Sequence, residues 1–238
     1  MDSASHLIGR RQLGRVLLGA VPIATALESS GALADVPPRE KTCERMSEFL
    51  NGFHFYADDI GRQVEANHYC THLSDDFHQC VIYDSSKPDA HLIGIEYIVS
   101  ERIFATLSGD EKRLWHSHHY EVKSGELIAP DMPEAAEHAF MKDLVTTYGK
   151  TWHCWQIDRD PSFPFGIPQL MMGFTQDGQT NAQLVRDRDR RFEISSAERR
   201  ADRADIPMPT VKAGANSWQT GRTLQLRLEE VAVKNLKP

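Results

Sequence analysis

The chain has 238 residues, and its 34 acidic and 27 Lys or Arg side chains give a formal net charge of −7 at pH 7. That length suits one domain with a sizeable hydrophobic core, or at most two small ones. The acidic balance argues against a nucleic-acid partner, because binding to phosphates needs a basic surface.

Residues 1–34 have the features of an export signal. Arg10 and Arg11 form a twin-arginine pair ahead of a short apolar run, and Ala32 and Ala34 supply the small residues of a cleavage site. The run has about a dozen mildly apolar residues, whereas a membrane span needs roughly 20; an amphipathic anchor helix is the alternative. We expect a signal peptide with cleavage near Ala34, a periplasmic or secreted location, and no transmembrane span in the mature chain.

A linker over residues 35–42 and a single domain over residues 43–234 are expected next. The run 91–100 is apolar on both faces, which predicts a central strand that is covered on both sides. The remaining patterns predict helices at 40–50, 109–115, 131–148, 181–192 and from 195, and strands at 52–56, 116–123, 151–157, 169–175 and 223–231.

Strands and helices therefore mix without a regular βαβ alternation, which favours the α+β class over doubly wound α/β. We expect a mixed or antiparallel sheet with its central strand near 91–100 and helices packed on it. Two small domains that divide near Asp131 are the alternative.

A β-hairpin is predicted over residues 64–83, with its turn at 74–76. This register sets Cys70 opposite Cys80 and His72 opposite His78, and all four side chains then share one face. In an exported protein the cysteines favour a disulfide. Free buried thiols and a zinc site made of the two cysteines and two histidines are the alternatives.

The densest group of metal-capable side chains lies in the segment 115–125. His116 and His118 would share one face of a strand, with Glu121 close behind. Glu96 falls within the apolar run 91–100, where a carboxylate needs a cation or a proton. Imidazole and carboxylate together suit zinc, iron or manganese. The alternative is a pair of core histidines bonded to the backbone, with an arginine beside Glu96.

From Phe53 to about Arg203 the sequence resembles the oil-body-associated protein family, a domain of unknown function first noted on plant seed oil bodies. The matching stretches are Arg62-Gln63-Val64-Glu65, His68, residues 79–85, 92–100, 115–118, 120–125 and 148–150, Trp155-Gln156, Asp158-Arg159, Pro164-x-Gly166-x-Pro168 and Leu170-Met171-Met172.

The resemblance implies a role at lipid-body surfaces, but it implies no catalytic residues. The export signal is a departure from this family, because an exported protein is not expected to coat a cytoplasmic lipid droplet. His72 and His119 are weaker site candidates than His116 and His118, because histidine is not expected there throughout the family.

Two classes of function follow from the sequence. We favour a non-catalytic module that binds a lipid surface or a protein partner, because no recognised catalytic motif is present. The alternative is a metal-dependent enzyme or metal-binding domain with a divalent ion such as zinc. Its ligands would be Glu96, His116 and His118, with His68 or Glu121 as the fourth group.

Overall fold

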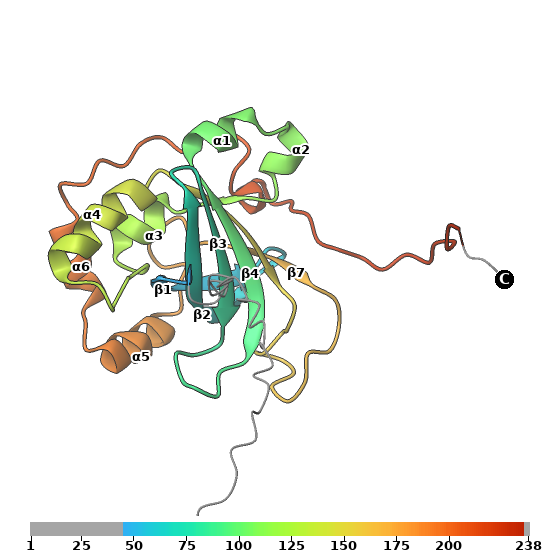
Figure 1. Cartoon of the computed structure of the whole chain (residues 1–238), viewed down its shortest axis with the longest axis horizontal. Helices are drawn as coiled ribbons and strands as arrows, with labels where there is room; N and C mark the ends of the chain where they lie inside the picture. The colour runs from blue at the N-terminus through green and yellow to red at the C-terminus, as the bar shows by residue number, and fades with distance from the viewer. Residues whose placement is uncertain (1–44, 236–238) are drawn as a thin grey trace, which may run out of the picture. The chain divides into compact units, whose positions relative to one another are not determined.

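Figure 1 shows the computed structural model, which describes residues 45–235. All strand pairings are antiparallel, and the strands follow the order β4-β3-β2-β1-β7-β6-β5. Because β4 also pairs with β6, six strands close into a barrel, and β5 is an additional strand beside β6. The strands are β1 (Glu48–Tyr56), β2 (Asp59–Ser74), β3 (Phe77–Tyr83), β4 (Leu92–Val99), β5 (His116–Ser117), β6 (Tyr148–His153) and β7 (Gln169–Met172).

The predicted α+β class is therefore wrong, because the fold is mostly β. The predicted strand 91–100 exists as β4, but it is hydrogen-bonded to β3 on one side and β6 on the other within a closed ring. A closed barrel has neither a central strand nor exposed edges among its members. Glu96 of β4 approaches His54 of β1, although β2 and β3 separate these strands in the sheet, so both side chains point into the barrel.

Three local predictions also fail. Glu48–Leu50 begins β1 rather than ending a helix, and the predicted strand 116–123 is only two residues long before helix α3 (His119–Ser124) starts. Residues 223–231 form no strand, although their leucines alternate. In each case the tertiary partner decided the conformation, since the short periodic pattern fits more than one element.

The hairpin of β2 and β3 confirms the predicted register at its key positions. Cys70 lies opposite Cys80 and His72 lies opposite His78, while the turn contains an irregularity that places Ser74 opposite Phe77. The structure joins Cys70 and Cys80 in a disulfide. The bridge faces the barrel interior, where it packs in an apolar cluster with Leu50.

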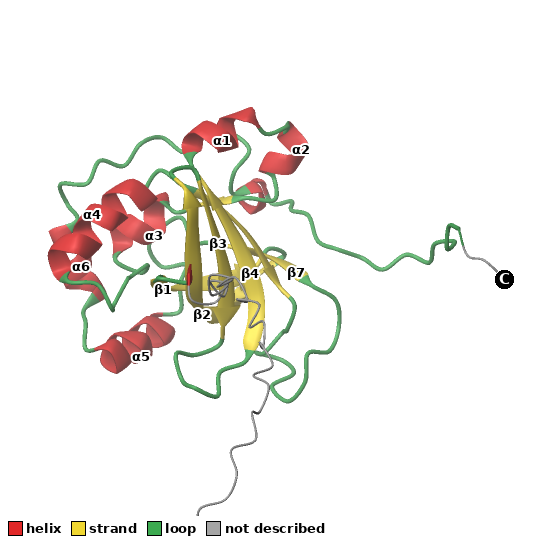
Figure 2. Cartoon of the chain, viewed as in Figure 1, coloured by secondary structure: helices red, strands yellow, loops and turns green. Residues whose placement is uncertain are grey.

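Figure 2 shows the helices in red: those within residues 119–144 and 182–202 lie together to the left of the yellow strands, and those within residues 101–112 lie above them. Val122 of α3 and Met141 and Leu144 of α4 pack against inward residues of the strands. These three side chains form an apolar cap at one end of the barrel interior. The helices are α1 (Glu101–Thr106), α2 (Gly109–Lys112), α3, α4 (Glu134–Leu144), α5 (Ala182–Phe192), α6 (Ser196–Asp202) and the 3₁₀ helix Ser217–Thr220.

Two buried arginines attach α5 and α6 to the segment that follows α3. Arg188 of α5 donates to Asn51 Oδ1 at 2.9 Å and to the Glu126 carbonyl at 2.7 Å. Arg203, the residue that ends α6, donates to the Val122 carbonyl at 2.7 Å and to Glu137 Oε1 at 3.0 Å. These charge-assisted bonds hold the helices to the loop that carries the end of α3.

The twin-arginine pair, the cleavage site and the 35–42 linker all lie outside the described residues. Among residues 45–235, none of the helices has the length and apolar content needed to cross a membrane.

Candidate metal centre

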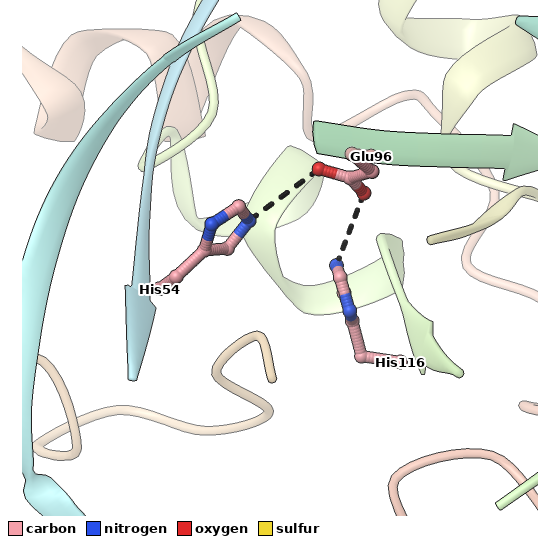
Figure 3. Close-up of side chains that lie close together, drawn as sticks. All are labelled: His54, Glu96 and His116. Carbon is pink, nitrogen blue, oxygen red and sulfur yellow. Dashed lines mark ion pairs between the residues drawn. The ribbon is translucent and has the colours of Figure 1, made fainter. Parts of the chain in front are cut away.

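The barrel interior holds a buried carboxylate surrounded by imidazoles. Glu96 is 1 % exposed. Its Oε1 lies 3.1 Å from His118 Nε2 and 3.4 Å from His116 Nε2. Its Oε2 lies 2.8 Å from His68 Nε2 and 3.5 Å from His54 Nε2. Figure 3 shows His54 and His116 approaching the two different oxygens of Glu96. The carboxylate therefore has one histidine pair on each oxygen.

The histidines beside Glu96 Oε1 come from different secondary-structure elements. His116 lies on β5, which Asn216 fixes by accepting from the Ser117 amide at 2.9 Å. His118 is the residue that precedes α3, and it converges with His116 although the two do not share a strand. The predicted juxtaposition thus arises from a strand end and a helix start, and not from alternation along one strand.

Two glycines leave the space that the cluster occupies. A Cβ at Gly149 would collide with Glu96 Oε1 and lie 2.8 Å from His116 Nε2. A Cβ at Gly173 would lie 2.6 Å from Glu121 Oε2. Any larger residue at either position would push the ligand atoms apart.

The hydrogen-bond partners of His118 set its tautomer. Thr147 Oγ1 lies 2.7 Å from the Leu144 carbonyl, to which its only proton is donated. The same oxygen lies 2.7 Å from His118 Nδ1, and it accepts from that nitrogen when its own proton goes to Leu144. In a neutral His118, Nε2 is then a lone pair that faces Glu96 Oε1. Two lone pairs at 3.1 Å repel each other unless a cation or a proton lies between them.

Burial keeps several of the imidazoles neutral. It lowers the pKa of His118 and brings that of His54 to about 4, because the charged form loses its hydration. Burial also acts to raise the pKa of Glu96, but the surrounding imidazoles, His116 first, outweigh it and hold that pKa well below its usual value. The cluster therefore combines an ionised carboxylate with imidazoles that burial keeps neutral, and neutral imidazole and carboxylate are the forms that bind metals.

Two further ligand atoms lack a partner within residues 45–235. Neither ring nitrogen of His116 makes a hydrogen bond there, and Glu121 Oε2 makes none. Glu121 Oε2 lies 4.0 Å from His116 Nε2, and burial raises the pKa of this carboxyl well above its usual value. Each unsatisfied buried group costs about 1–3 kcal/mol. A cation at this point would satisfy His116 Nε2 and Glu121 Oε2, although not His116 Nδ1.

Two of the separations match those around a tetrahedral ion, whereas the 4.0 Å between His116 Nε2 and Glu121 Oε2 is longer. Ligand atoms 2.0–2.2 Å from zinc are separated by about 3.4 Å, close to the 3.1 and 3.4 Å separations of the two nitrogens from Glu96 Oε1. The ligand atoms of His116, His118 and Glu121 also lie within 4.8 Å of one another. A cavity of about 10 Å³ adjoins Glu96, His118 and Glu121, which is on the order of the space that one water molecule needs.

The structure brings together all five predicted site residues, Glu96, His116, His118, His68 and Glu121. His119 points elsewhere: its ring lies 5.7 Å from that of Tyr148. Sequence reasoning missed His54 and His153, which contact each other at 3.3 Å. Both are polar residues at inward positions of strands that are otherwise buried, and this signal could have identified them.

A family model described as a protein of unknown function, DUF1264, matches residues 40–207. The chain belongs to this family. It is 42 % identical over 190 residues to oil body-associated protein 1B of Arabidopsis thaliana, covering 80 % of this chain and 79 % of the relative. It is 46 % identical over 182 residues to oil body-associated protein 2A of Zea mays, covering 76 % of this chain and 71 % of the relative. No solved structure matches this DUF1264 member.

Proposed function

We propose that this DUF1264 protein binds one divalent transition-metal ion, with zinc the first candidate, inside its barrel. The ligands are Glu96 Oε1, His116 Nε2, His118 Nε2 and Glu121 Oε2. The observation that carries the proposal is the convergence of His118 Nε2 and His116 Nε2 on Glu96 Oε1, at 3.1 and 3.4 Å, in a buried site.

The other histidines act as supports in this proposal. His68 and His54 contact Glu96 Oε2, the oxygen that faces away from the ion. Thr147 orients His118 through its other nitrogen, as outer partners of metal-bound histidines generally do. The cavity beside the ligands has room for an ion or a water molecule but for no larger substrate. Because the cavity is so small, we favour an ion that stabilises the protein or is stored in it. Catalysis on a large molecule would need more space.

Thr147→Val tests the site without removing a ligand. The valine cannot accept from His118 Nδ1, so we expect zinc affinity to fall about 10–100-fold. Thr146→Val is the matched control, because Thr146 makes the same type of bond, to the Asp143 carbonyl at 3.1 Å, outside the cluster. Competition with a chelating dye, on protein purified without an affinity tag, measures both variants. Equal affinities in the two variants would exclude the assigned role of Thr147.

A lipid surface is a second candidate ligand, and one loop favours it. Phe163 and Phe165 are 62 % and 61 % exposed, and their rings lie 5.8 Å apart in a proline-rich loop. Exposed apolar side chains that lie together mark sites of interaction with proteins or membranes. The similar proteins of Arabidopsis and maize are also named as oil body-associated.

Phe163→Ser/Phe165→Ser should reduce flotation of the protein with phospholipid-coated triglyceride droplets by several fold. The double variant Leu226→Ser/Leu228→Ser, which alters exposed leucines of the C-terminal segment, is the control. Two results would exclude the loop as a lipid contact. One is that the unaltered protein does not float with the droplets, and the other is that the loop substitutions leave its flotation unchanged.

We also propose that residues 1–34 direct export by a twin-arginine route. Arg10→Lys/Arg11→Lys should then leave the protein in the cytoplasm with its N-terminus intact. Fractionation followed by N-terminal sequencing checks this result, and normal export of the double variant would refute the assignment.

A further inference from the structure

A second cavity, of about 550 Å³, opens at the mouth of the barrel beside the turn that joins β2 and β3. Its walls include Glu48 of β1, His72 of β2, His78 of β3 and two residues at the end of α4, Leu144 and Thr147. Leu144 also lines the inner cavity, and Thr147 contacts His118. This mouth cavity therefore lies directly above the inner cluster.

Three ligand-type side chains meet in the mouth cavity. His72 and His78 are opposite each other in the hairpin, and their rings stack with centroids 4.5 Å apart and planes 8° apart. The Glu48 carboxylate faces both rings: Oε2 lies 3.0 Å from His78 Nδ1, and Oε1 lies 4.0 Å from His72 Nδ1. The Glu48 carboxylate is thus in hydrogen-bond contact with Nδ1 of His78 and lies near Nδ1 of His72, on the same side of the stacked rings.

The surroundings of this group are accessible and negative. The side chains of His72, His78 and Glu48 are 46 %, 14 % and 13 % exposed, so ions from solvent can reach them. Asp75 and Asp143 add two carboxylates to the cavity wall, against one ammonium group from Lys142. A concave site lined mostly by one sign of charge concentrates ions of the opposite sign.

We propose that Glu48, His72 and His78 bind a second divalent transition-metal ion at the mouth of the barrel. Two imidazoles and a carboxylate supply three ligands, and the open cavity leaves further positions to water, as in exchangeable sites. The two rings are stacked, so side-chain rotations have to bring their nitrogens onto one ion; His72 is exposed, whereas His78 and Glu48 are partly buried.

We infer from its position that this group is where an ion enters on the way to the inner site, and this part rests on the function proposed above. His72 follows Cys70 and His68 along one face of β2, so it lies about 13 Å from His68 along the strand. The Cys70–Cys80 bridge and Leu144 occupy the layer between them. An ion that leaves the mouth group for Glu96 has to pass this apolar layer.

The test counts zinc bound to the full untagged chain after chelator treatment, by equilibrium dialysis at pH 7. We expect two classes of site in the unaltered protein. The double variant His72→Gln/His78→Gln should keep the tighter equivalent and lose the weaker one. His91→Gln should keep both, although His91 is equally exposed and also lies beside a carboxylate, that of Asp84 at 2.8 Å.

The results separate the two proposals. Either of two results would overturn the mouth site. The double variant could retain both zinc equivalents, or the unaltered protein could bind a single zinc equivalent that only Glu96→Gln removes. If Glu96→Gln retains all zinc while the double variant loses one equivalent, the mouth site stands and the inner site is wrong. The rate at which the inner equivalent is filled should fall in the double variant, and an unchanged rate would overturn the role in entry. Both substituted histidines reach solvent, so circular dichroism should show an unchanged fold.

Discussion

His116→Ala should abolish the inner metal site. The substitution removes the ligand that lies between Glu96 and Glu121, and the two carboxylates then face each other without the imidazole. We expect the tightly bound metal to fall from about one equivalent to near zero, measured by elemental analysis of untagged protein. The thermal stabilisation by zinc should disappear with it, which at a free-zinc concentration of 100 times the dissociation constant amounts to about 2.7 kcal/mol.

His119→Ala is the matched control for this loss. His119 is as buried as His116, and burial lowers its pKa to about 4, but its ring packs near Tyr148 and away from Glu96. Both variants lose a buried imidazole, so both lose some stability. Only His116→Ala should lose the metal. Equal metal contents in the two variants would exclude the inner site and leave a hydrogen-bond network that stabilises the core.

Arg203→Met should give the largest loss of stability outside the cluster. Arg203 and Glu137 are 1 % and 3 % exposed, so the substitution removes the buried guanidinium from this carboxylate and from two backbone carbonyls. Glu137 keeps the Ala129 amide and the partly exposed Arg199 as partners. Breaking such a buried pair costs about 3–5 kcal/mol. Urea unfolding followed by circular dichroism measures the change in the free energy of unfolding.

Arg199→Met is the control, because Arg199 also contacts Glu137, at 3.3 Å, from the same helix but with a side chain that is 21 % exposed. We expect a cost of about 1 kcal/mol or less for this partly solvated pair. A similar cost for the two variants would show that burial of the Arg203–Glu137 pair has no particular importance.

Local patterns predicted many of the elements but not their closure. The turn predicted at 74–76 set the register of Cys70 and Cys80, and the predicted helix at 109–115 begins where α2 does, with Ser108 accepting from the Glu111 amide. The pairing of β4 with β6 joins segments about fifty residues apart. No local signal encodes that pairing, and without it the same strands form an open sheet.

The candidate site was predictable where unusual residues cluster in the sequence. Glu96 was informative because it interrupts an apolar run, and His116 and His118 were informative because they are neighbours. His54 and His153 occur singly in different strands, and only closure of the barrel brings them within 3.3 Å. The buried arginines were missed for a related reason, since Arg188 and Arg203 lie in helices whose composition is typical of solvent-exposed surfaces.

The closed ring has a consequence for when an ion can be acquired. Glu96, His116 and His118 meet only after the early strands and β6 have paired, so the site forms late, after the entropic cost of closing long loops has been met. An ion bound at the proposed site would therefore not nucleate folding and would be selected by a finished barrel. If the chain is also exported already folded, as we propose, the metal concentrations of the compartment where it folds would decide which ion the proposed site binds.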